Sequence, residues 1–291
     1  MAIGTQIRNP LEWGWDQLKK AESAVEATGH ALGGAEAGSE AGPAAVRRIR
    51  IDDLRDALAR GVDDFRACRT DVLFLCLVYP VAGLLLAYLA FGYDFLHLVF
   101  PLASGFALLG PIAAIGLYEM SRRRERGQAP SWADALSVVG SPAFGAILVL
   151  GLYLLAAFLL WLVAAVAIYG ATLGPEPPTS IGAFAQEIVT TGAGWAMIAI
   201  GIAVGFVFAV VVMTVSVVSF PMLLDRDVGL YPAIGTSIRA VAANPLPMAV
   251  WGAIVAGGLL LGAVTLFIGL AVVMPVLGHA TWHLYRKLVA D

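Results

Sequence analysis

The sequence is short of charge for its length. Asp, Glu, Lys and Arg make up 13% of its 291 residues, and 59% of the residues are hydrophobic. Soluble globular proteins contain about a quarter charged residues. A chain this poor in charge cannot cover its surface with polar side chains. We therefore expect the lipid bilayer to be its main surroundings, and we expect no nucleic-acid partner.

Cysteine is scarce as well. The two cysteines are Cys68, in a basic segment, and Cys76, inside an apolar run. Their spacing fits no zinc pattern and two thiols make no disulfide framework, so we interpret both as small buried hydrophobic residues. Residues 1–50 also lack an apolar stretch of signal-peptide length, so we expect no cleavage there.

Long apolar runs, by contrast, are abundant. A helix needs about 20 apolar residues to cross the hydrocarbon core of a bilayer. The pattern predicts six such helices, at residues 72–91, 97–119, 143–169, 194–221, 247–266 and 268–285. The last two come from one run that is twice too long for a single span, so we place a turn near 266–269. The predicted fold class is all-α, a polytopic membrane helix bundle.

Lys and Arg are missing from one side of this bundle. The predicted outer connections, of which 170–192 is the longest, carry only the acidic residues Asp94, Glu176 and Glu187. All 18 Lys and Arg fall on the other side. Cationic loops stay in the cytoplasm, so we place both termini there and the chain in a bacterial inner membrane. On that side, Asp225 is expected to pair with Arg239 or with the cluster 122–126.

Three short amphipathic stretches, each before a pair of spans, indicate three units of an interfacial helix plus a hairpin. The first has an apolar face made of Ile51, Leu54, Leu58, Val62 and Phe65. The second begins with an N-cap box of Ser131 and Asp134, and the third has Ile234, Ile238 and Val241 on one face before Asn244-Pro245. Repeats are common in transporters, but any chain of hairpins needs similar interface residues, and both interpretations stay open.

The first residues differ from the rest. Residues 1–29 form a predicted amphipathic surface helix, residues 30–45 a flexible Gly/Ala linker, and residues 46–291 the six-span membrane domain. The helix could lie on the membrane, which we favour, or dock a partner.

Glycine and proline are placed for helix packing. Two GxxxG pairs, 201/205 and 258/262, let helices approach closely, and we interpret them as packing within the bundle. Prolines are expected to kink or open four spans, and they are Pro80, Pro111, Pro221 and Pro275.

Two of the four histidines form a candidate metal site. His279 and His283 stand four residues apart in MPVLGHATWHLYRKL and share a helical face. Such a pair binds zinc or copper when further ligands complete the site, and Glu119 is the candidate because PIAAIGLYEMSRR and PVLGHATWHLYRK match in layout. Alternatively, His279 bonds a neighbouring helix, His283 meets the headgroups, and Trp282 and Tyr285 belong to an aromatic belt.

The stretches GLYEMSRRRERG, FPMLLDRDVG, RAVAANP and MPVLGHATWHLYRKL resemble an uncharacterised bacterial family of multi-span integral membrane proteins, domain of unknown function 2189. The resemblance runs from about Ile51 to the C-terminus. It implies no catalytic residues, because the family defines none. Some members carry a loose cytochrome c oxidase label, but the four histidines include no pair that could clamp a haem inside the spans, so an accessory subunit alone would fit.

Three functional hypotheses remain. The centres of the predicted spans hold no Asp, Glu, His, Lys or Arg, which argues against an ion-coupled transporter or a proton pump. We favour a non-enzymatic scaffold or accessory protein of a membrane complex, such as a respiratory one, with a membrane-protein partner or a second copy of the chain. The second hypothesis is a carrier for a neutral or lipid-like molecule. The third is a metal- or haem-binding accessory redox subunit; otherwise no cofactor is expected.

Overall fold

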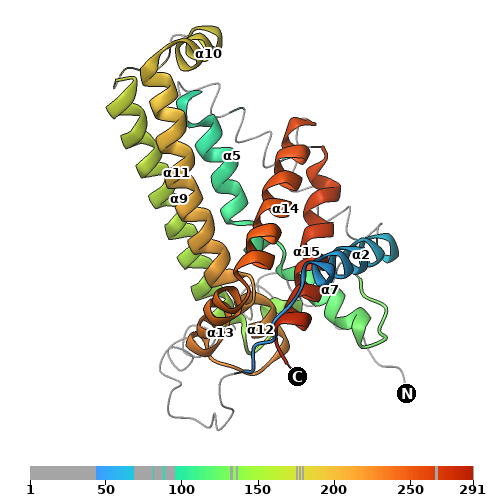
Figure 1. Cartoon of the computed structure of the whole chain (residues 1–291). Helices are drawn as coiled ribbons and strands as arrows, with labels where there is room; N and C mark the ends of the chain where they lie inside the picture. Colours follow the sequence, from blue (N-terminus) through green and yellow to red (C-terminus); the bar gives the residue numbers. More distant parts are fainter. Residues whose placement is uncertain are drawn as a thin grey trace, which may run out of the picture.

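The structure is a computed structural model of the whole chain (Figure 1). It describes residues 44–68, 96–131, 134–135, 137–174, 180–265 and 268–290, together with Val81, Tyr88, Glu176 and Pro178. These residues are helical, apart from turns and one isolated β-bridge, so the all-α prediction is confirmed for them. The predicted surface helix 1–29, most of the linker and the predicted span 72–91 lie outside the described residues.

Among the described residues, three stretches of helix are long and apolar enough to cross a membrane. They are α9 (Phe144–Thr172), the pair α11 (Gly192–Ser216) and α12 (Ser219–Asp225), and α14 (Pro245–Val264). In Figure 1, α9 and α11 run side by side through the length of the molecule. Their outward side chains are large and apolar, for example Val163 and Phe206, which are 65% and 67% exposed. An exposed apolar surface of this extent is typical of contact with lipid.

The predicted span 97–119 is divided. It consists of η1 (Leu96–Leu98), α5 (Val99–Leu108), α6 (Gly110–Ala113) and α7 (Ile115–Glu125). Pro111 explains the break, because a proline lacks the backbone N–H and its ring clashes with the carbonyl four residues earlier. The kink predicted at Pro111 is therefore present, and it ends α5 instead of bending one continuous helix.

The same effect separates α11 from α12. Pro221 cannot donate a hydrogen bond to the carbonyl of residue 217, and the helix is interrupted at Val217 and Val218. Ser237 of α13 (Leu230–Ala243) bonds the backbone groups at this break. Its hydroxyl accepts from the Val218 N–H at 3.2 Å and donates to the Thr214 carbonyl at 2.7 Å. The break is thus satisfied by hydrogen bonds, as an interior helix end requires.

The final pair of helices forms the predicted hairpin. Helix α14 ends at Val264 and α15 (Leu270–Leu288) begins six residues later, as predicted for a turn near 266–269. The second GxxxG pair packs within this hairpin: a Cβ at Gly258 would lie 3.2 Å from Val273, and one at Gly262 would lie 2.4 Å from Leu270. Pro275 lies inside α15 without ending it.

Helix α2 (Ile51–Ala67) makes extensive contacts with α15. The two helices meet where a Cβ on Gly61 would lie only 2.7 Å from the Cβ of Ala280. In Figure 1, α2 crosses α15 near its lower half, and α7 lies on the same part of the molecule. On its other side α15 meets α7, where a Cβ on Gly278 would lie 2.6 Å from Leu117. We use the name α13 end for the end of the molecule that contains α2, α7, α12, α13 and the part of α15 that they contact.

The buried faces of the two interfacial helices differ from the predicted ones. In α2 the buried residues are Leu54, Ala57, Gly61 and Asp64, while Ile51 is 41% exposed. In α13 they are Leu230, Ala233, Thr236, Ser237 and Ala240, while Ile238 is 45% exposed. Small side chains let a helix approach its neighbours closely, so most of the buried residues are small, while Leu58, Phe65, Ile234 and Val241 of the predicted faces are partly buried against the core. Of the predicted box of Ser131 and Asp134, one half is present: the Ser131 N–H donates to the Asp134 carboxylate at 2.8 Å, and the Ser131 hydroxyl donates to the same oxygen at 3.0 Å.

The chain before α2 is tied to the C-terminus. Val46 and Val289 form an antiparallel bridge, and the Arg47 N–H donates to the Leu288 carbonyl at 2.8 Å. Asn244, between α13 and α14, accepts from the Ile49 N–H at 2.8 Å and donates to the Arg47 carbonyl at 3.0 Å. Sequence position alone predicted Asn244 only as a helix stop, whereas here it also anchors the start of the membrane domain.

The number of spans stays a prediction. Three candidate spans are present among the described residues, one predicted span lies outside them, and α5 is short. Helix α15 carries Arg286 and Lys287 in its last turn and is not among the candidates.

Candidate functional site

A half-open pocket lies at the other extremity of the bundle, which we call the α10 end. It has a volume of about 430 Å³ and lies between η1, α5, α9, α10 (Ile181–Thr190) and α11. Figure 1 shows α10 across the ends of the long helices, far from α13. The side chains that line the pocket are aliphatic or aromatic except for His97. Most known ligand pockets are similarly apolar, with a few polar groups that orient the ligand.

Helix α10 is the lid of this pocket, and its sequence explains why it forms. The Ser180 hydroxyl accepts from the Ala183 N–H at 3.1 Å, which caps the first turn. Ile181, Phe184 and Ile188 recur at helical spacing and all line the pocket. The sequence interpretation treated 170–192 as an outer connection and missed this helix. The spacing of those three apolar residues was the signal that could have revealed it.

Close packing fixes α10 against α11. A Cβ on Gly194 would lie 2.3 Å from the Ile188 carbonyl oxygen, so only glycine allows the tight turn between the helices. The Thr191 hydroxyl accepts from the Gly194 N–H at 2.9 Å and caps α11. The Trp195 indole donates to the Val189 carbonyl at 3.1 Å. These contacts hold the pocket-facing side of α10 toward the bundle.

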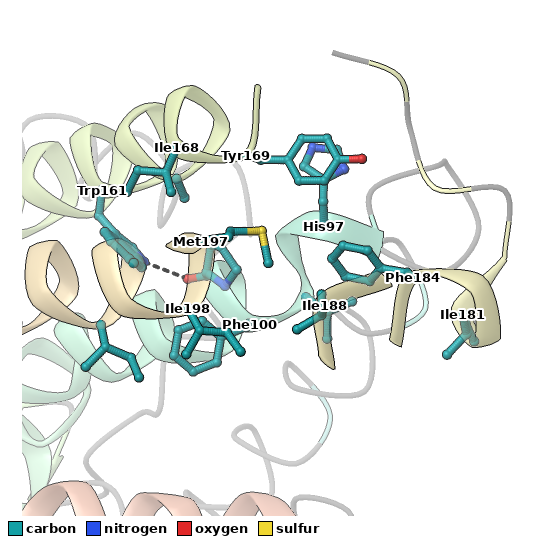
Figure 2. A pocket seen from close by; sticks show the side chains of 15 residues that line it. His97, Phe100, Trp161, Ile168, Tyr169, Ile181, Phe184, Ile188, Met197 and Ile198 are labelled. Atoms are coloured by element: carbon teal, nitrogen blue, oxygen red, sulfur yellow. Dashed lines mark hydrogen bonds between the residues drawn. The ribbon is translucent and has the colours of Figure 1, made fainter. Parts of the chain in front are cut away.

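Three aromatic rings form one wall of the pocket. His97 stacks on Tyr169 with ring centroids 4.4 Å apart, and Phe184 meets Tyr169 edge-on at 6.2 Å. Figure 2 shows the His97 and Tyr169 rings overlapping, with Phe184 beside them. The Tyr169 hydroxyl donates to the Glu176 carbonyl at 2.6 Å. The rings therefore join η1, α9 and α10 around the pocket.

The deeper wall is formed by α9 and α11. The Trp161 indole N–H donates to the Pro101 carbonyl at 3.0 Å, the dashed line in Figure 2. A Cβ on Gly205 would lie 3.1 Å from the Trp161 ring, so this glycine packs against α9. Gly201, by contrast, lines the pocket and has no atom within 4 Å of an added Cβ. Of the first GxxxG pair, Gly205 thus packs against a neighbouring helix, whereas Gly201 borders open space.

One polar atom of the pocket wall has no partner. Nδ1 of His97 is buried and makes no hydrogen bond with the described residues. The polar hydrogens of Trp161 and Tyr169 are already bonded to backbone carbonyls. A buried nitrogen without a partner costs on the order of 1–3 kcal/mol.

At the α13 end, the predicted metal residues are engaged in two separate groups. Glu119 is buried and pairs with Arg122 and Arg123, each at 2.7 Å. Nδ1 of His279 lies 2.8 Å from the Ser121 hydroxyl of α7, so the prediction that His279 bonds a neighbouring helix is confirmed. Nε2 of His283 lies 2.8 Å from Asp64 on α2. The prediction that His283 meets the headgroups is wrong, since its side chain is 11% exposed.

Asp64 is the centre of the second group and was not singled out from the sequence. Its carboxylate accepts hydrogen bonds from Ser121 at 2.6 Å, from His283, and from Arg124. Burial by itself would raise the pKa of Asp64, but the bonds from His283, Ser121 and Arg124 outweigh it and lower the pKa to about 2. The available signal was its place on α2, in line with Leu54, Ala57 and Gly61.

The aromatic residues beside the histidines are internal. Trp282 and Tyr285 are 0% and 1% exposed, so the predicted aromatic belt is wrong for them. The Trp282 indole donates to Glu125 at 3.0 Å and the Tyr285 hydroxyl to Asp225 at 2.9 Å. Asp225 also pairs with Arg126 at 3.7 Å, which confirms the alternative with the 122–126 cluster.

No group of three or more His, Cys, Asp and Glu side chains is placed to hold a metal ion within the part of the chain that the structure describes. The site of His279, His283 and Glu119 therefore stays a prediction. Its third member is engaged by arginines, and the histidines contact Ser121 and Asp64 instead.

One family of proteins resembles part of this chain. Residues 99–225 match the family described as "Predicted integral membrane protein (DUF2189)". This part of the chain is similar to that family. The match runs from the first residue of α5 to the last of α12, so it contains every residue that lines the pocket except His97. The family description names an integral membrane protein and no activity. No curated protein and no solved structure matches the chain.

Proposed function

We propose that this integral membrane protein binds a neutral, lipid-like molecule in the pocket at the α10 end and acts as its carrier. The observation that carries the proposal is the pocket itself, whose described lining side chains are aliphatic or aromatic apart from His97. A hydrophobic molecule with a small polar group matches such a wall.

The mouth of the pocket supports entry from the lipid. Phe100, Ile181 and Ile202 line the pocket and are 62%, 59% and 59% exposed. Apolar residues at the rim would be costly against water and are favourable against acyl chains. A molecule dissolved in the bilayer could therefore enter sideways, without crossing a polar surface.

The charge of the region supports a neutral ligand. The connection 170–192 contains Glu176 and Glu187 but no Lys or Arg, and the described residues that line the pocket include no charged side chain. An anionic headgroup would find no cation there and would be repelled by the two glutamates. Phosphate-bearing lipids are therefore a poor match.

Gly201 offers a direct test of occupancy. Because Gly201 lines the pocket and an added Cβ there meets no atom within 4 Å, we expect a Gly201→Leu side chain to take up part of the pocket. Gly257→Leu is the matched control, since Gly257 also has open space and lies on α14, away from the pocket. Purification in mild detergent followed by extraction and mass spectrometry should find a neutral lipid-like molecule with wild type and Gly257→Leu, and much less of it with Gly201→Leu. Equal amounts with all three would contradict the proposal.

The other hypotheses stay predictions. A scaffold or accessory role, with a membrane-protein partner or a second copy, would be supported by a stable complex in mild detergent. A redox role would be supported by a stoichiometric metal or haem that is lost in a His279→Ala, His283→Ala variant. The six-span, bacterial inner-membrane arrangement with cytoplasmic termini is part of the same proposal and rests on the distribution of Lys and Arg.

A further inference from the structure

We infer that the pocket recognises the length of a hydrocarbon chain, and that Trp161 and Gly201 set the length that fits. This inference rests on the proposed function and specifies which neutral, lipid-like molecules the pocket takes. It follows from where the open space ends along the helices that surround it, and from which side chains close it.

The pocket extends for a limited distance along the bundle. Helices α5, α9 and α11 each line it only with the part of the helix that lies nearest to α10 (Figure 1). Counted away from α10, the last lining residues are Pro101 on α5, Trp161 on α9 and Ile202 on α11. The wall that α9 contributes, from Tyr169 to Trp161, is about 12 Å long, since a helix rises about 1.5 Å per residue. The space therefore stops at a similar level on all three helices.

The Trp161 ring closes the inner end of the pocket. Trp161 is 2% exposed, and its indole N–H donates to the Pro101 carbonyl at 3.0 Å, which fixes the ring between α9 and α5. About one helical turn beyond the last lining residues, the helices are in close contact. A Cβ on Gly105 of α5 would lie 2.3 Å from the Phe158 ring of α9, and a Cβ on Gly205 would lie 3.1 Å from Trp161. Such packing leaves a chain no room between these helices beyond the ring.

Gly201 keeps the space open on the α10 side of this ring. Gly201 and Gly205 are four residues apart on α11, so they share a face of the helix. Since Gly205 packs on Trp161, Gly201 borders the pocket one turn closer to α10, where an added Cβ meets no atom within 4 Å. Figure 2 shows Trp161 on one side of the pocket and Phe184 on the other, with Met197 between them. A chain that fills the pocket thus passes Gly201 and ends against Trp161.

A wall of this shape selects chains by their length. A chain in a bilayer is already surrounded by apolar lipid, so its gain on entering the pocket comes from close packing against the wall. Each methylene that fits between α10 and Trp161 adds such contacts. Further methylenes remain among the acyl chains at the lipid-facing mouth and add none. Binding should therefore strengthen with length up to the chain that fills the pocket, and then level off.

The length dependence is measured with the full-length protein in nanodiscs of a saturated phosphatidylcholine. Tagged discs that contain the protein and untagged empty discs share a mixture of straight-chain alkan-1-ols, from octanol to octadecanol. The two kinds of disc are then separated on the tag, extracted and analysed by mass spectrometry. The ratio of each alcohol between them is its enrichment, which removes the preference of the alcohol for the bilayer itself. In wild type, the enrichment should rise with chain length and level off at one length, the break point.

Two substitutions should move the break point in opposite directions. Trp161→Ala removes the ring that ends the pocket, so longer chains should fit, whereas Gly201→Ala adds a methyl group to the open space, so shorter chains should fill it. We expect a shift of about one carbon for Gly201→Ala and a larger one for Trp161→Ala, because a close-packed wall responds to the volume of one methylene. Trp251→Ala and Gly257→Ala on α14 are the matched controls, since Trp251 is also 2% exposed and Gly257 also has open space. Both should leave the break point unchanged.

The outcomes separate the inference from the proposed function. Enrichment without a break point, or a break point that stays in place in Gly201→Ala, would overturn the selection by length, while the pocket still binds a chain. The same conclusion follows if Trp251→Ala moves the break point as far as Trp161→Ala does. If Trp161→Ala does not fold, Gly201→Ala decides alone, because its methyl group meets no neighbouring atom. If no alcohol is enriched in wild type, with Gly201→Leu indistinguishable from it, the proposed function fails as well.

Discussion

Oδ2 of Asp64 lies 2.8 Å from Nε2 of His283, although 219 positions separate the two residues. This contact joins α2, at the start of the described chain, to α15 at its end. Because an ionised carboxylate can only accept, His283 donates from Nε2, and the Ser121 hydroxyl also donates to Asp64. Ser121 must then accept from Nδ1 of His279. A continuous set of hydrogen bonds thus connects α2, α7 and α15.

Removing the Asp64 charge should loosen α2. An Asp64→Asn variant weakens three charge-assisted hydrogen bonds inside the protein, and we expect a loss on the order of 2 kcal/mol in the free energy of unfolding. Asp63→Asn is the matched control, because the Asp63 side chain is 63% exposed and its ion pair is with Arg66 at 3.7 Å. Unfolding in a mixed-detergent titration measures both. Equal stabilities would show that Asp64 does not anchor the helix.

Lowering the pH should remove the stabilisation that the ionised Asp64 carboxylate contributes. The pKa of Asp64 is lowered to about 2 in the folded protein, against about 4 in an unfolded chain. A lowered pKa means that the stabilisation is complete above about pH 4 and is lost as the pH falls through 2. The stability difference between wild type and Asp64→Asn should therefore shrink as the pH falls from about 4 to 2. A difference that is independent of pH down to 2 would contradict this assignment.

The crossing of α2 and α15 should not tolerate a methyl group. A Gly61→Ala side chain would lie 2.7 Å from both the backbone nitrogen and the Cβ of Ala280, so the helices must separate. We expect a lower midpoint of thermal unfolding, by several degrees, because overpacking costs about 1–3 kcal/mol. Gly170→Ala, in the last part of α9 with open space around it, should be neutral or stabilising, since alanine favours a helix over glycine. A higher midpoint of thermal unfolding in both variants would show that α2 and α15 do not pack closely at Gly61.

Asn244 should hold the segment that precedes α2. An Asn244→Ala variant removes the bonds to the Ile49 N–H and the Arg47 carbonyl. We expect faster hydrogen exchange at residues 46–50, because a lost side-chain bond leaves buried backbone groups without partners. Gln128→Ala, at an exposed position, should leave that exchange unchanged. Unaltered exchange in Asn244→Ala would mean that the bridge of Val46 with Val289 suffices.

The orientation in the membrane can be read from two surface positions. In a background with Cys68→Ala and Cys76→Ala, Gly182→Cys on α10 and Gln128→Cys after α7 introduce thiols at opposite ends of the bundle. The excess of Lys and Arg near Gln128 predicts that it faces the cytoplasm. In intact cells, a membrane-impermeant maleimide should label Gly182→Cys and leave Gln128→Cys unmodified until the cells are lysed. The reverse pattern would invert the topology.

The sequence by itself determined that lipid surrounds the protein, where its long apolar helices form, and where those helices break. Apolar runs of sufficient length predicted α9, α11 and α14 to within a few residues, because a helix is the way for one segment to satisfy its own backbone in lipid. Pro111, Pro221 and the pair Asn244-Pro245 marked breaks through the loss of a backbone donor. These effects act within a few residues, so a sequence pattern contains them.

The tertiary structure decided which faces and which distant residues meet. Small residues on α2 and α13 are buried because their neighbours approach closely, and no periodicity of bulky side chains reveals that. His283 bonds Asp64 rather than a headgroup. His97 stacks on Tyr169, which lies 72 positions later in the sequence. The pocket exists because α10 folds over α9 and α11, and the space left beside Gly201 depends on how all three pack. Contacts of this kind depend on the relative placement of helices, which local sequence patterns do not specify.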